Sequence, residues 1–508
     1  MWKWTKTTPI VNPLESLKLN LQEILPSLEL DPMLNKDFNS VLQKEVFQAL
    51  SRCVEALNIE GYLVGGFVRD HLLGRGKAKD IDVVAIGSGI ELAKAIQKEL
   101  PDAQNVQIFK SYGTAMVKWQ DLTLEFVGAR KESYTEESRN PAVSKGTLED
   151  DQNRRDFTIN ALAVSLNAHN KGMLLDPFNG LDDLKKGIIK TPLEPEVTFS
   201  DDPLRMLRAI RFATQLNFEI EAQSLKSIQK NADRIAIISK ERIVEELHKI
   251  MLTPQPSVGF LLLEQNGLLE LILPELIQLK GIEEIEGQRH KDNFYHTLEV
   301  VDNICKHTDD LWLRWAALLH DIGKAPTKKF HPKIGWTFHA HEFVGSKMVY
   351  KLFKRLKMPL NEKMKYVQKL VMMSSRPIII SEEIVTDAAV RRLVFDAGEV
   401  LEDLITLCEA DITTKNPTRY KRYHHNFKIV RQKIEEVEER DRVRNFQPPV
   451  SGEMIMEHFN LSPCKEIGLI KEAIKEAILE GEIPNEYNAA FELMLKKGSE
   501  IGLEVYEK

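Results

Sequence analysis

Residues 63–87 read LVGGFVRDHLLGRGKAKDIDVVAIG, and this stretch decides the fold. Gly65 and Gly66 follow a short apolar run, and a helical pattern begins directly after them. Glycines at a helix start let backbone N–H groups come close to a ligand, and Arg69 adds a guanidinium that suits a phosphate. The pattern predicts a phosphate-holding turn between a strand and a helix. The alternative is an ordinary tight turn.

The end of the same stretch places two carboxylates on one strand. Asp80 and Asp82 are two residues apart in the run DIDVVAIG, so in a strand both side chains point to the same face. Carboxylates on one face repel each other unless a positive ion lies between them, and Mg²⁺ prefers oxygen ligands. Glu125, in the run LTLEFVG, would add a third carboxylate from a neighbouring strand. We therefore expect a catalytic Mg²⁺ site here; an exposed strand face is the alternative.

Length, charge and cysteine spacing limit the function classes. The chain has 508 residues, and roughly 150 residues per domain indicates three or four units. A net charge of −7 means that any nucleic acid must bind through local basic faces. The four cysteines are far apart and form no C-x-x-C pair, which disfavours a zinc knuckle or a disulfide framework and favours a reducing compartment.

Targeting signals are also missing from the sequence. Apolar runs are too short to span a bilayer, and the start, MWKWTKTTPIVNP, lacks the apolar stretch of a secretory signal. We expect a cytoplasmic protein without membrane contact.

Strand signals lie early and helical signals late. DIDVVAIG, GTAMVKW and LTLEFVGA have the alternating or β-branched pattern of short strands, whereas residues 131–155 show no period and are predicted to form a mobile loop. After LLDPFNGLDDLKKG (174–187) the pattern is helical almost to the end, as in SKERIVEELHKIM, where Ile243, Leu247, Ile250 and Met251 share one face. The predicted class is α+β, a small α/β head with a mixed sheet and a long all-helical body.

Further motifs follow the glycines and carboxylates in a fixed order. They are RRDFTINALAVSL (154–166), DPFNGLDDL (176–184), DDPLRMLRAIRFA (201–213) and SKERIVEEL (239–247). The series resembles the polymerase-β-like nucleotidyltransferases, in the form found in tRNA nucleotidyltransferases (CCA-adding enzymes) and bacterial poly(A) polymerases. The resemblance implies transfer of a nucleoside monophosphate from a triphosphate to an RNA 3′ end, with two Mg²⁺ on Asp80 and Asp82. The nucleotide-binding residues expected from these motifs are Gly65, Gly66, Arg69, Arg155, Asp156, Asn160, Asp202, Arg205, Arg208 and Arg211.

Asp202 and Arg205 have the chemistry to choose a base. They are three residues apart, so near a helix start they share a face, where Asp accepts hydrogen bonds and Arg donates them. Cytosine and adenine both show an amino donor beside an acceptor, whereas uracil and guanine would leave buried polar groups unpaired. The pair predicts selection of CTP and ATP. Alternatively, Asp201-Asp202-Pro203 only starts a helix and the Asp–Arg pair is a surface ion pair.

The resemblance does not decide which nucleotides the enzyme adds to the RNA 3′ end. Bacterial poly(A) polymerases carry a basic Gly-(Arg/Lys)-(Arg/Lys)-Phe-type segment after the carboxylates, and the corresponding stretch here, IFKSYGTAMVKW, lacks it. The segment with Arg130, Glu132, Tyr134 and Arg139 looks like the flexible loop of enzymes that add the terminal A. We expect CCA addition and repair. The alternatives are poly(A) polymerase, a partial CC- or A-adding enzyme and, from another class, an HD phosphohydrolase whose head only binds RNA.

Histidines and aspartates mark a second site. LWLRWAALLHDIGKA (311–325) predicts a helix stopped by Gly323, with His320 and Asp321 in its last turn. With His296, His341 and Asp411, this ordered set resembles the HD metal-dependent phosphohydrolase domain, which implies a divalent metal of unspecified identity at these five residues. The hypothesis is hydrolysis of 2′,3′-cyclic or terminal phosphates at damaged tRNA ends.

The predicted organisation has five parts. They are an N-terminal extension (1–35), the nucleotidyltransferase head (36–195), a helical neck for nucleotide recognition (196–284), the HD domain (285–420) and a helical tail (421–508). Ile467, Ile470, Ile474, Ala477 and Ile478 recur at helical spacing in the tail, which is either a packing element or a tRNA-holding surface. Lys328, Lys329 and Lys333 are candidate phosphate contacts. The expected partners are the tRNA 3′ end, CTP and ATP, with no obligatory protein partner.

Overall fold

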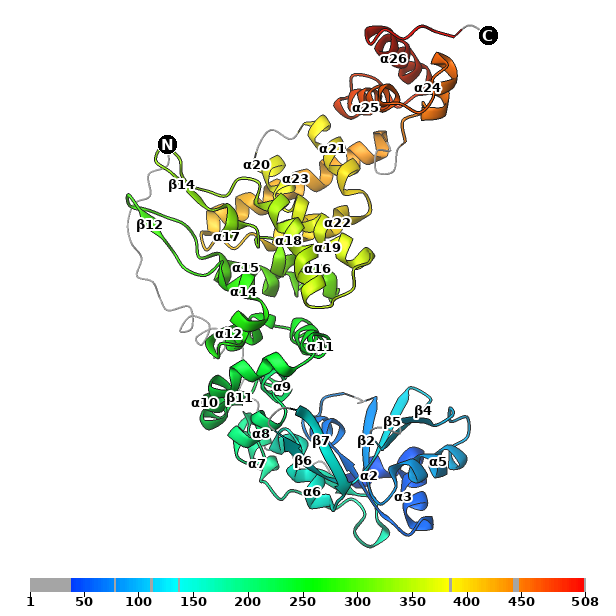
Figure 1. Cartoon of the computed structure of the whole chain (residues 1–508), viewed down its shortest axis with the longest axis vertical. Coiled ribbons are helices and arrows are strands. Elements are labelled where there is room, and N and C mark those ends of the chain that lie inside the picture. Colours follow the sequence, from blue (N-terminus) through cyan, green and yellow to red (C-terminus); the bar gives the residue numbers. More distant parts are fainter. Residues whose placement is uncertain are drawn as a thin grey trace. The chain divides into compact units, whose positions relative to one another are not determined.

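The computed structural model describes residues 38–76, 79–109, 113–135, 138–382, 386–441 and 447–506 (Figure 1). The chain divides into two compact units, Met1–Arg205 with Leu216–Asn231, and Met206–Gln215 with Ala232–Lys508. The predicted N-terminal extension, residues 1–35, lies outside the described residues. The other predicted domain boundaries remain predictions.

The first unit is built on a mixed seven-stranded sheet with the order β3-β4-β5-β2-β1-β8-β9. β2 and β5 run parallel, and the other neighbours are antiparallel. The strands are β1 (Glu60–Val64), β2 (Asp80–Ile86), β3 (Gln107–Phe109), β4 (Thr114–Trp119), β5 (Leu122–Gly128), β8 (Ala163–Ser165) and β9 (Leu174–Leu175). The three predicted strands form β2, β4 and β5, so the mixed α/β head is confirmed.

Burial along β2 explains how the sheet leaves room for a site. Ile81, Val83 and Val84 are buried, whereas Asp80 is exposed and Asp82 half-buried, so only the first residues of the strand face solvent on one side. α3 and α5 pack together, and α5 lies against β2, β4 and β5 (Figure 1). The helices of this unit are α2 (Phe38–Leu42), α3 (Glu45–Ala56), α4 (Gly66–Leu72), α5 (Gly89–Glu99), α6 (Leu148–Asn153), α7 (Gly180–Lys186), α8 (Pro195–Asp201) and α10 (Ala222–Asn231).

The loop predicted over residues 131–155 is wrong. The structure has a two-stranded antiparallel hairpin, β6 (Arg130–Thr135) and β7 (Ser138–Lys145), followed by α6. The hairpin is not part of the seven-stranded sheet, so neither of its faces needs an apolar row. Without that row the sequence has no period of two, which is why the strands were missed. The side chains of Glu132, Tyr134 and Arg139 lie outside the described part of the chain.

The second unit is helical, as the sequence predicts. α15, α16, α18, α19 and α22 pack on one another, and the large side chains of Phe294, Trp315 and Phe353 are fully buried in this unit. The helices are α11 (Lys240–Met251), α12 (Pro256–Gln265), α13 (Leu268–Ile272), α14 (Pro274–Ile277), α15 (Asn293–Ile304), α16 (Leu311–Leu319), α17 (Lys324–Thr327), α18 (His341–Arg355), α19 (Glu362–Met373), α20 (Arg376–Glu382), α21 (Asp387–Ala397), α22 (Leu401–Ala410), α23 (Pro417–Asp441), α24 (Gly452–Phe459), α25 (Lys465–Glu480) and α26 (Tyr487–Glu500). α9 (Leu204–Leu216) contains residues of both units.

The predicted apolar face of the tail is confirmed. Ile467, Ile470, Ile474, Ala477 and Ile478 are buried on α25, which contacts α21, α24 and α26. The role of this face is therefore packing, at least for these five side chains. Among the helices that the structure describes, none has the length and apolar character that a membrane span requires.

Candidate functional site

The pairing of β2 with β5 brings three carboxylates together. Asp80 and Asp82 are at alternate positions of β2 and so point to one face. The parallel register places Glu125 of β5 directly beside Asp82. Ile81 and Leu124, which alternate with these acids, are buried on the opposite side. The sheet therefore fixes three acidic side chains on one face of neighbouring strands, as the sequence predicts.

This cluster is electrostatically unfavourable without a cation. Burial raises the pKa of Glu125, and the charges of Asp82 and Asp80 raise it further. The donor set contains only carboxylate oxygens, which fits a hard divalent ion such as Mg²⁺. A bound cation would lower the pKa of Glu125, since a positive charge favours the ionised carboxylates.

Gly65 forms the turn that lies against these acids. Its φ of +72° is a backbone conformation that side chains rarely adopt, and a Cβ there would lie 2.9 Å from Oδ2 of Asp82 and 3.3 Å from Nη1 of Arg155. A Cβ on Gly66 would meet only the end of the Arg69 side chain, at 3.6 Å. The two glycines therefore differ. At position 65, both the backbone conformation and the lack of space favour glycine, whereas neither restriction applies at position 66.

A buried aspartate, missed in the sequence, holds the arginine beside Gly65. Asp151 is fully buried, and its Oδ2 accepts from Nε and Nη2 of Arg155 at 2.9 and 2.8 Å, while Oδ1 accepts from Arg154. Burial alone would raise the pKa of Asp151, but the guanidiniums of Arg155 and Arg154 outweigh it and lower that pKa. The spacing of three and four residues before the arginines in a helical segment is the signal that would have revealed it.

Arg69, Asp156 and Asn160 form a buried hydrogen-bonded chain. Arg69 donates from Nη1 to Oδ1 of Asn160 at 2.7 Å, and Asn160 donates from Nδ2 to Oδ1 of Asp156 at 3.0 Å. Arg69 also bonds its neighbour Asp70 at 2.8 Å. The structure brings these three predicted nucleotide-binding residues together, but each one uses side-chain atoms to fix the next. These bonds join α4 to residues 156–160, and the predicted nucleotide contacts of the three residues stay predictions.

A helix begins directly after Asp201-Asp202-Pro203, as the alternative prediction has it. Asp201 is the last residue of α8, Asp202 follows it, and α9 begins at Leu204. Oδ1 of Asp202 accepts the N–H of Leu204 at 3.2 Å, so Asp202 does cap this start. Arg205 donates from Nη2 to the carbonyl of Arg154 at 2.6 Å and from Nη1 to that of Thr198 at 3.4 Å. Backbone carbonyls, not the carboxylate of Asp202, therefore orient this guanidinium.

Arg208 and Arg211 belong to the second unit. Nε of Arg211 donates to Glu246 at 2.5 Å and its guanidinium lies 3.8 Å from the ring centre of Phe212, while Arg208 lies 5.5 Å from the same ring. Arg211 is buried and neutralised by Glu246. This geometry gives Arg211 a packing role, and its predicted nucleotide contact stays a prediction.

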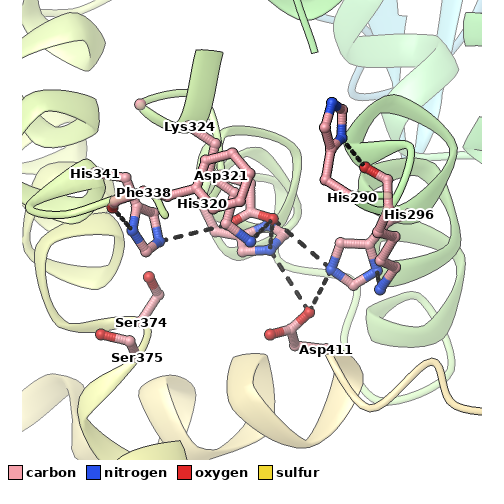
Figure 2. Close-up of polar contacts among 12 residues, drawn as sticks. His290, His296, His320, Asp321, Lys324, Phe338, His341, Ser374, Ser375 and Asp411 are labelled. Atoms are coloured by element: carbon pink, nitrogen blue, oxygen red, sulfur yellow. Dashed lines mark hydrogen bonds and ion pairs between the residues drawn. The ribbon is translucent and has the colours of Figure 1, made fainter. Parts of the chain in front are cut away.

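The predicted HD residues converge from several helices of the second unit (Figure 2). His296 lies in α15, His320 and Asp321 directly follow α16, His341 begins α18 and Asp411 directly follows α22. Nε2 of His296 lies 2.7 Å from Oδ1 of Asp411, and Nε2 of His320 lies 3.4 Å from Asp321 and 3.7 Å from Asp411. One ligand atom from each of His296, His320 and Asp411 lies within 4.8 Å of the others.

Asp321 and His341 complete the group at slightly longer range. Asp321 lies 3.8 Å from His296 and 3.7 Å from Nε2 of His341, and it also accepts from Lys324 at 2.6 Å. A Cβ on Gly323 would lie 2.0 Å from the carbonyl oxygen of His341, so only glycine allows this close approach. The predicted helix thus ends at Leu319, before His320, because the chain must turn there to meet α18.

These residues fit a divalent metal. Nε2 of His320 is buried and has no hydrogen-bond partner among the described residues, and Oδ1 of Asp411 is buried 2.7 Å from Nε2 of His296 and 3.7 Å from Nε2 of His320. His320 places Nδ1 2.8 Å from the carbonyl of Ala317, and His341 places Nδ1 2.9 Å from that of Phe338, so protonation of Nδ1 leaves Nε2 as the ligand atom. Burial lowers the pKa of His320, but Asp321 and Asp411 outweigh it and raise that pKa to about 10. The site favours positive charge.

Comparisons with known proteins match the regions that contain the two sites. Sequence profiles match the Poly A polymerase head domain at residues 61–190, the probable RNA and SrmB-binding site of polymerase A at 217–279, and the HD domain at 293–416. An A-adding tRNA nucleotidyltransferase of Deinococcus radiodurans is 33% identical and covers 66% of this chain and 76% of its own length. A Multifunctional CCA protein of Ectopseudomonas mendocina is 28% identical over 71% of this chain and 86% of its own length.

A solved structure shows the same fold. The Bacillus stearothermophilus CCA-adding enzyme in complex with CTP has a TM-score of 0.62 at 21% identity, and the match covers 90% of this chain and 99% of that chain. Together with the relatives, this defines a nucleotide-transferring enzyme with a Poly A polymerase head and an HD domain. The chain belongs to the tRNA nucleotidyltransferase family.

Substitution of Gly65 separates a steric role from backbone strain. Gly65→Ala places a side chain at φ +72° and ψ −139°, and Gly267→Ala places one at φ +75° and ψ −2°, so both positions favour glycine, but a Cβ at Gly267 meets nothing within 4 Å. Gly267→Ala should lose about 1–2 kcal/mol of unfolding free energy, and Gly65→Ala about 1–3 kcal/mol because its backbone conformation is open almost only to glycine. Only Gly65→Ala should lower nucleotide transfer, by about 100-fold, because it displaces Asp82 and Arg155. Transfer assays and thermal unfolding would measure both; equal transfer rates for the two variants would contradict the assignment.

Metal binding by the HD residues is tested with Co²⁺, whose visible absorption responds to imidazole ligands. His320→Ala should weaken Co²⁺ binding by more than about 100-fold, because it removes a buried ligand nitrogen. His339→Ala is the matched control, since His339 lies nearby but is exposed. Retention of the wild-type Co²⁺ spectrum by His320→Ala would show that these residues do not form the site.

Proposed function

We propose that this enzyme adds CMP and AMP, from CTP and ATP, to the 3′ end of tRNA, in both synthesis and repair of the CCA terminus. The observation that supports it is the face where Asp80, Asp82 and Glu125 lie beside Gly65 and Arg155. When bound there, two Mg²⁺ would supply activation of the attacking hydroxyl and stabilisation of the leaving pyrophosphate. The carboxylates would hold these ions, with Asp80 and Asp82 as the principal ligands.

The remaining residues of the head would position the triphosphate. The close approach of the Gly65 turn leaves space for phosphate oxygens where any side chain would intrude. Arg155, fixed by Asp151 on one side and donating to the carbonyl of Asn160 at 3.3 Å on the other, offers a guanidinium beside the carboxylates. A charge held by a buried partner needs little reorganisation when the substrate binds.

Asp202 and Arg205 would select the base without a template. Two N–H groups of Arg205 are used on backbone carbonyls, which fixes the guanidinium plane and leaves other donors of its five for a base. Oδ1 of Asp202 caps α9, which leaves Oδ2 as an acceptor. Cytosine and adenine offer the complementary edge, whereas uracil and guanine do not.

Addition of A alone is the second candidate. The relative from Deinococcus radiodurans, named as an A-adding enzyme, is more similar to this chain than the Multifunctional CCA protein of Ectopseudomonas mendocina. An A-adding enzyme would need a tRNA that already ends in CC. The two candidates share the chemistry of the head and differ in the tRNA end that is accepted and in whether CTP is used.

One experiment tests the proposal and separates these candidates. The protein is incubated with tRNA that lacks CCA, or that ends in C or CC, together with CTP, ATP or both, and the product ends are sequenced. Full CCA addition predicts completion of all three tRNAs. Extension of only the CC-ending tRNA would assign A addition, long A tails would assign a poly(A) polymerase, and no extension would reject the proposal.

Loss of Arg205 should relax the choice of base. Arg205→Ala should reduce the preference for CTP and ATP over UTP and GTP by about tenfold or more, because the wrong bases no longer leave its donors unpaired. Arg52→Ala removes an exposed arginine that pairs with Glu99 and should leave the preference unchanged. Misincorporation in single-nucleotide assays measures it, and an unchanged preference in Arg205→Ala would refute base readout.

For the HD residues we propose hydrolysis of 2′,3′-cyclic or terminal phosphates at tRNA ends, with a divalent metal on His296, His320, Asp321, His341 and Asp411. The buried ligand atoms of His320 and Asp411 support metal binding.

A tRNA substrate and four free cysteines are also in accord with the cytoplasmic location that we propose.

A further inference from the structure

A cavity of about 360 Å³ opens beside the HD residues. Its wall includes Asp411 and Thr413, and Oγ1 of Thr413 lies 3.0 Å from Nδ1 of His296. Two of the metal-binding candidates are therefore either in the cavity wall or one hydrogen bond away from it. A molecule in this cavity would reach the metal centre directly, and the volume lies in the range of small-ligand sites.

Lys291 brings a positive charge to this cavity. Its ammonium lies 2.9 Å from Oγ1 of Thr413 and also contacts Nδ1 of His296, so its tip points inward although the residue is exposed. An ammonium has three donors, and neither of these two partners is an anion. Asp411 and Asp321 lie close enough to attract this ammonium, but among the described residues no carboxylate pairs with it directly. An anionic group in the cavity would take its remaining donor.

Part of the cavity wall is aromatic. Tyr423 and Phe427, four residues apart on α23, both line it, and Phe427 is buried while Tyr423 is half-buried. An accessible aromatic ring beside a cationic group is the combination with which proteins bind a nucleobase and its phosphate.

The charges of α23 are divided along its length. Near its C-terminal end, Arg431 pairs with Glu402 and Glu409, and Lys433 and Arg440 pair with Asp387. Residues 417–428, which read PTRYKRYHHNFK, contain no acid, and the exposed cations there are Lys421, Arg422 and Lys428. The structure describes no carboxylate partner for these three. Among the described residues, these three exposed cations of α23 are therefore not neutralised by a carboxylate, unlike the cations nearer its C-terminal end.

We infer that residues 417–428 and the cavity beside Asp411 bind a single-stranded RNA end that carries a terminal phosphate. The terminal base stacks on Tyr423, the phosphate meets Lys291 next to the metal ligands, and Lys421, Arg422 and Lys428 contact the preceding phosphates. Because the chain has a net charge of −7, this local basic face is what makes RNA binding to the HD region feasible. The role of the bound RNA as a substrate rests on the proposed phosphohydrolase activity, whereas the position of the binding site rests on the geometry of this surface.

Photo-crosslinking of the full chain tests the location. The probe is a short single-stranded RNA whose last nucleotide is 4-thiouridine 3′-phosphate, and the crosslinked peptide is identified by mass spectrometry. We expect a crosslink within residues 417–428, which Tyr423→Ala weakens by about tenfold and Tyr423→Phe retains. Crosslinks confined to other parts of the chain would overturn the inference.

Binding measurements test the charges. Lys421→Glu/Arg422→Glu should weaken binding of the 3′-phosphorylated RNA by about tenfold or more, whereas Lys351→Glu/Lys354→Glu, an equal charge change at exposed positions of α18, should not. Lys291→Met should remove the preference for a 3′-phosphate over a 3′-hydroxyl while its Co²⁺ spectrum shows that the metal site is intact. Equal losses in both double variants would show nonspecific attraction and reject the site.

Hydrolysis distinguishes failure of this inference from failure of the phosphohydrolase. If the RNA crosslinks at residues 417–428 but its phosphate is never released with any divalent metal, the binding site stands and the hydrolase is rejected. If a 2′,3′-cyclic mononucleotide is hydrolysed but RNA does not bind at α23, the hydrolase stands and this inference is rejected.

Discussion

Three negative charges on one face of two neighbouring strands are the constraint on which the head depends. The parallel register of β2 and β5 forces Asp82 and Glu125 side by side, and the strand period adds Asp80 to the same face. Divalent cations would relieve their mutual repulsion, which is why we propose that this cluster holds Mg²⁺. Gly65 approaches this cluster closely because it has no side chain, and Asp151 holds Arg155 beside it from within the core.

In the HD region the fold also brings potential metal ligands together, but here they include imidazole nitrogens as well as carboxylate oxygens. Imidazole nitrogens and carboxylates from separate helices are buried together, and backbone carbonyls at Ala317 and Phe338 fix the rings of His320 and His341. In each site, groups that repel or that lack partners are retained at the cost of local stability, which is characteristic of sites that bind a ligand. The mixed nitrogen and oxygen donors suit a transition metal, whereas the head offers only oxygen. One chain thus presents two groups of potential metal ligands whose donor atoms differ.

Sequence reasoning succeeded where a local period or an ordered motif carries the information. Strand alternation located Asp80 and Asp82, and helical spacing located the buried face of α25. It failed for β6 and β7, because a hairpin outside the main sheet has no apolar face to mark it. Asp151 was missed because its importance comes from complete burial. The division of charge along α23 was also hidden, because it depends on which cations find carboxylates on other helices.

The central claim is that Asp80 and Asp82 of β2 bind divalent ions beside the Gly65 turn. Crystals of the protein grown with Mn²⁺ and a non-hydrolysable CTP analogue, with data collected at the manganese absorption edge, test it most directly. The account predicts two anomalous peaks about 3.5–4 Å apart that touch the carboxylates of Asp80 and Asp82 and the phosphates of the analogue. Bound nucleotide with no manganese at these carboxylates, or manganese elsewhere in the head, would contradict it.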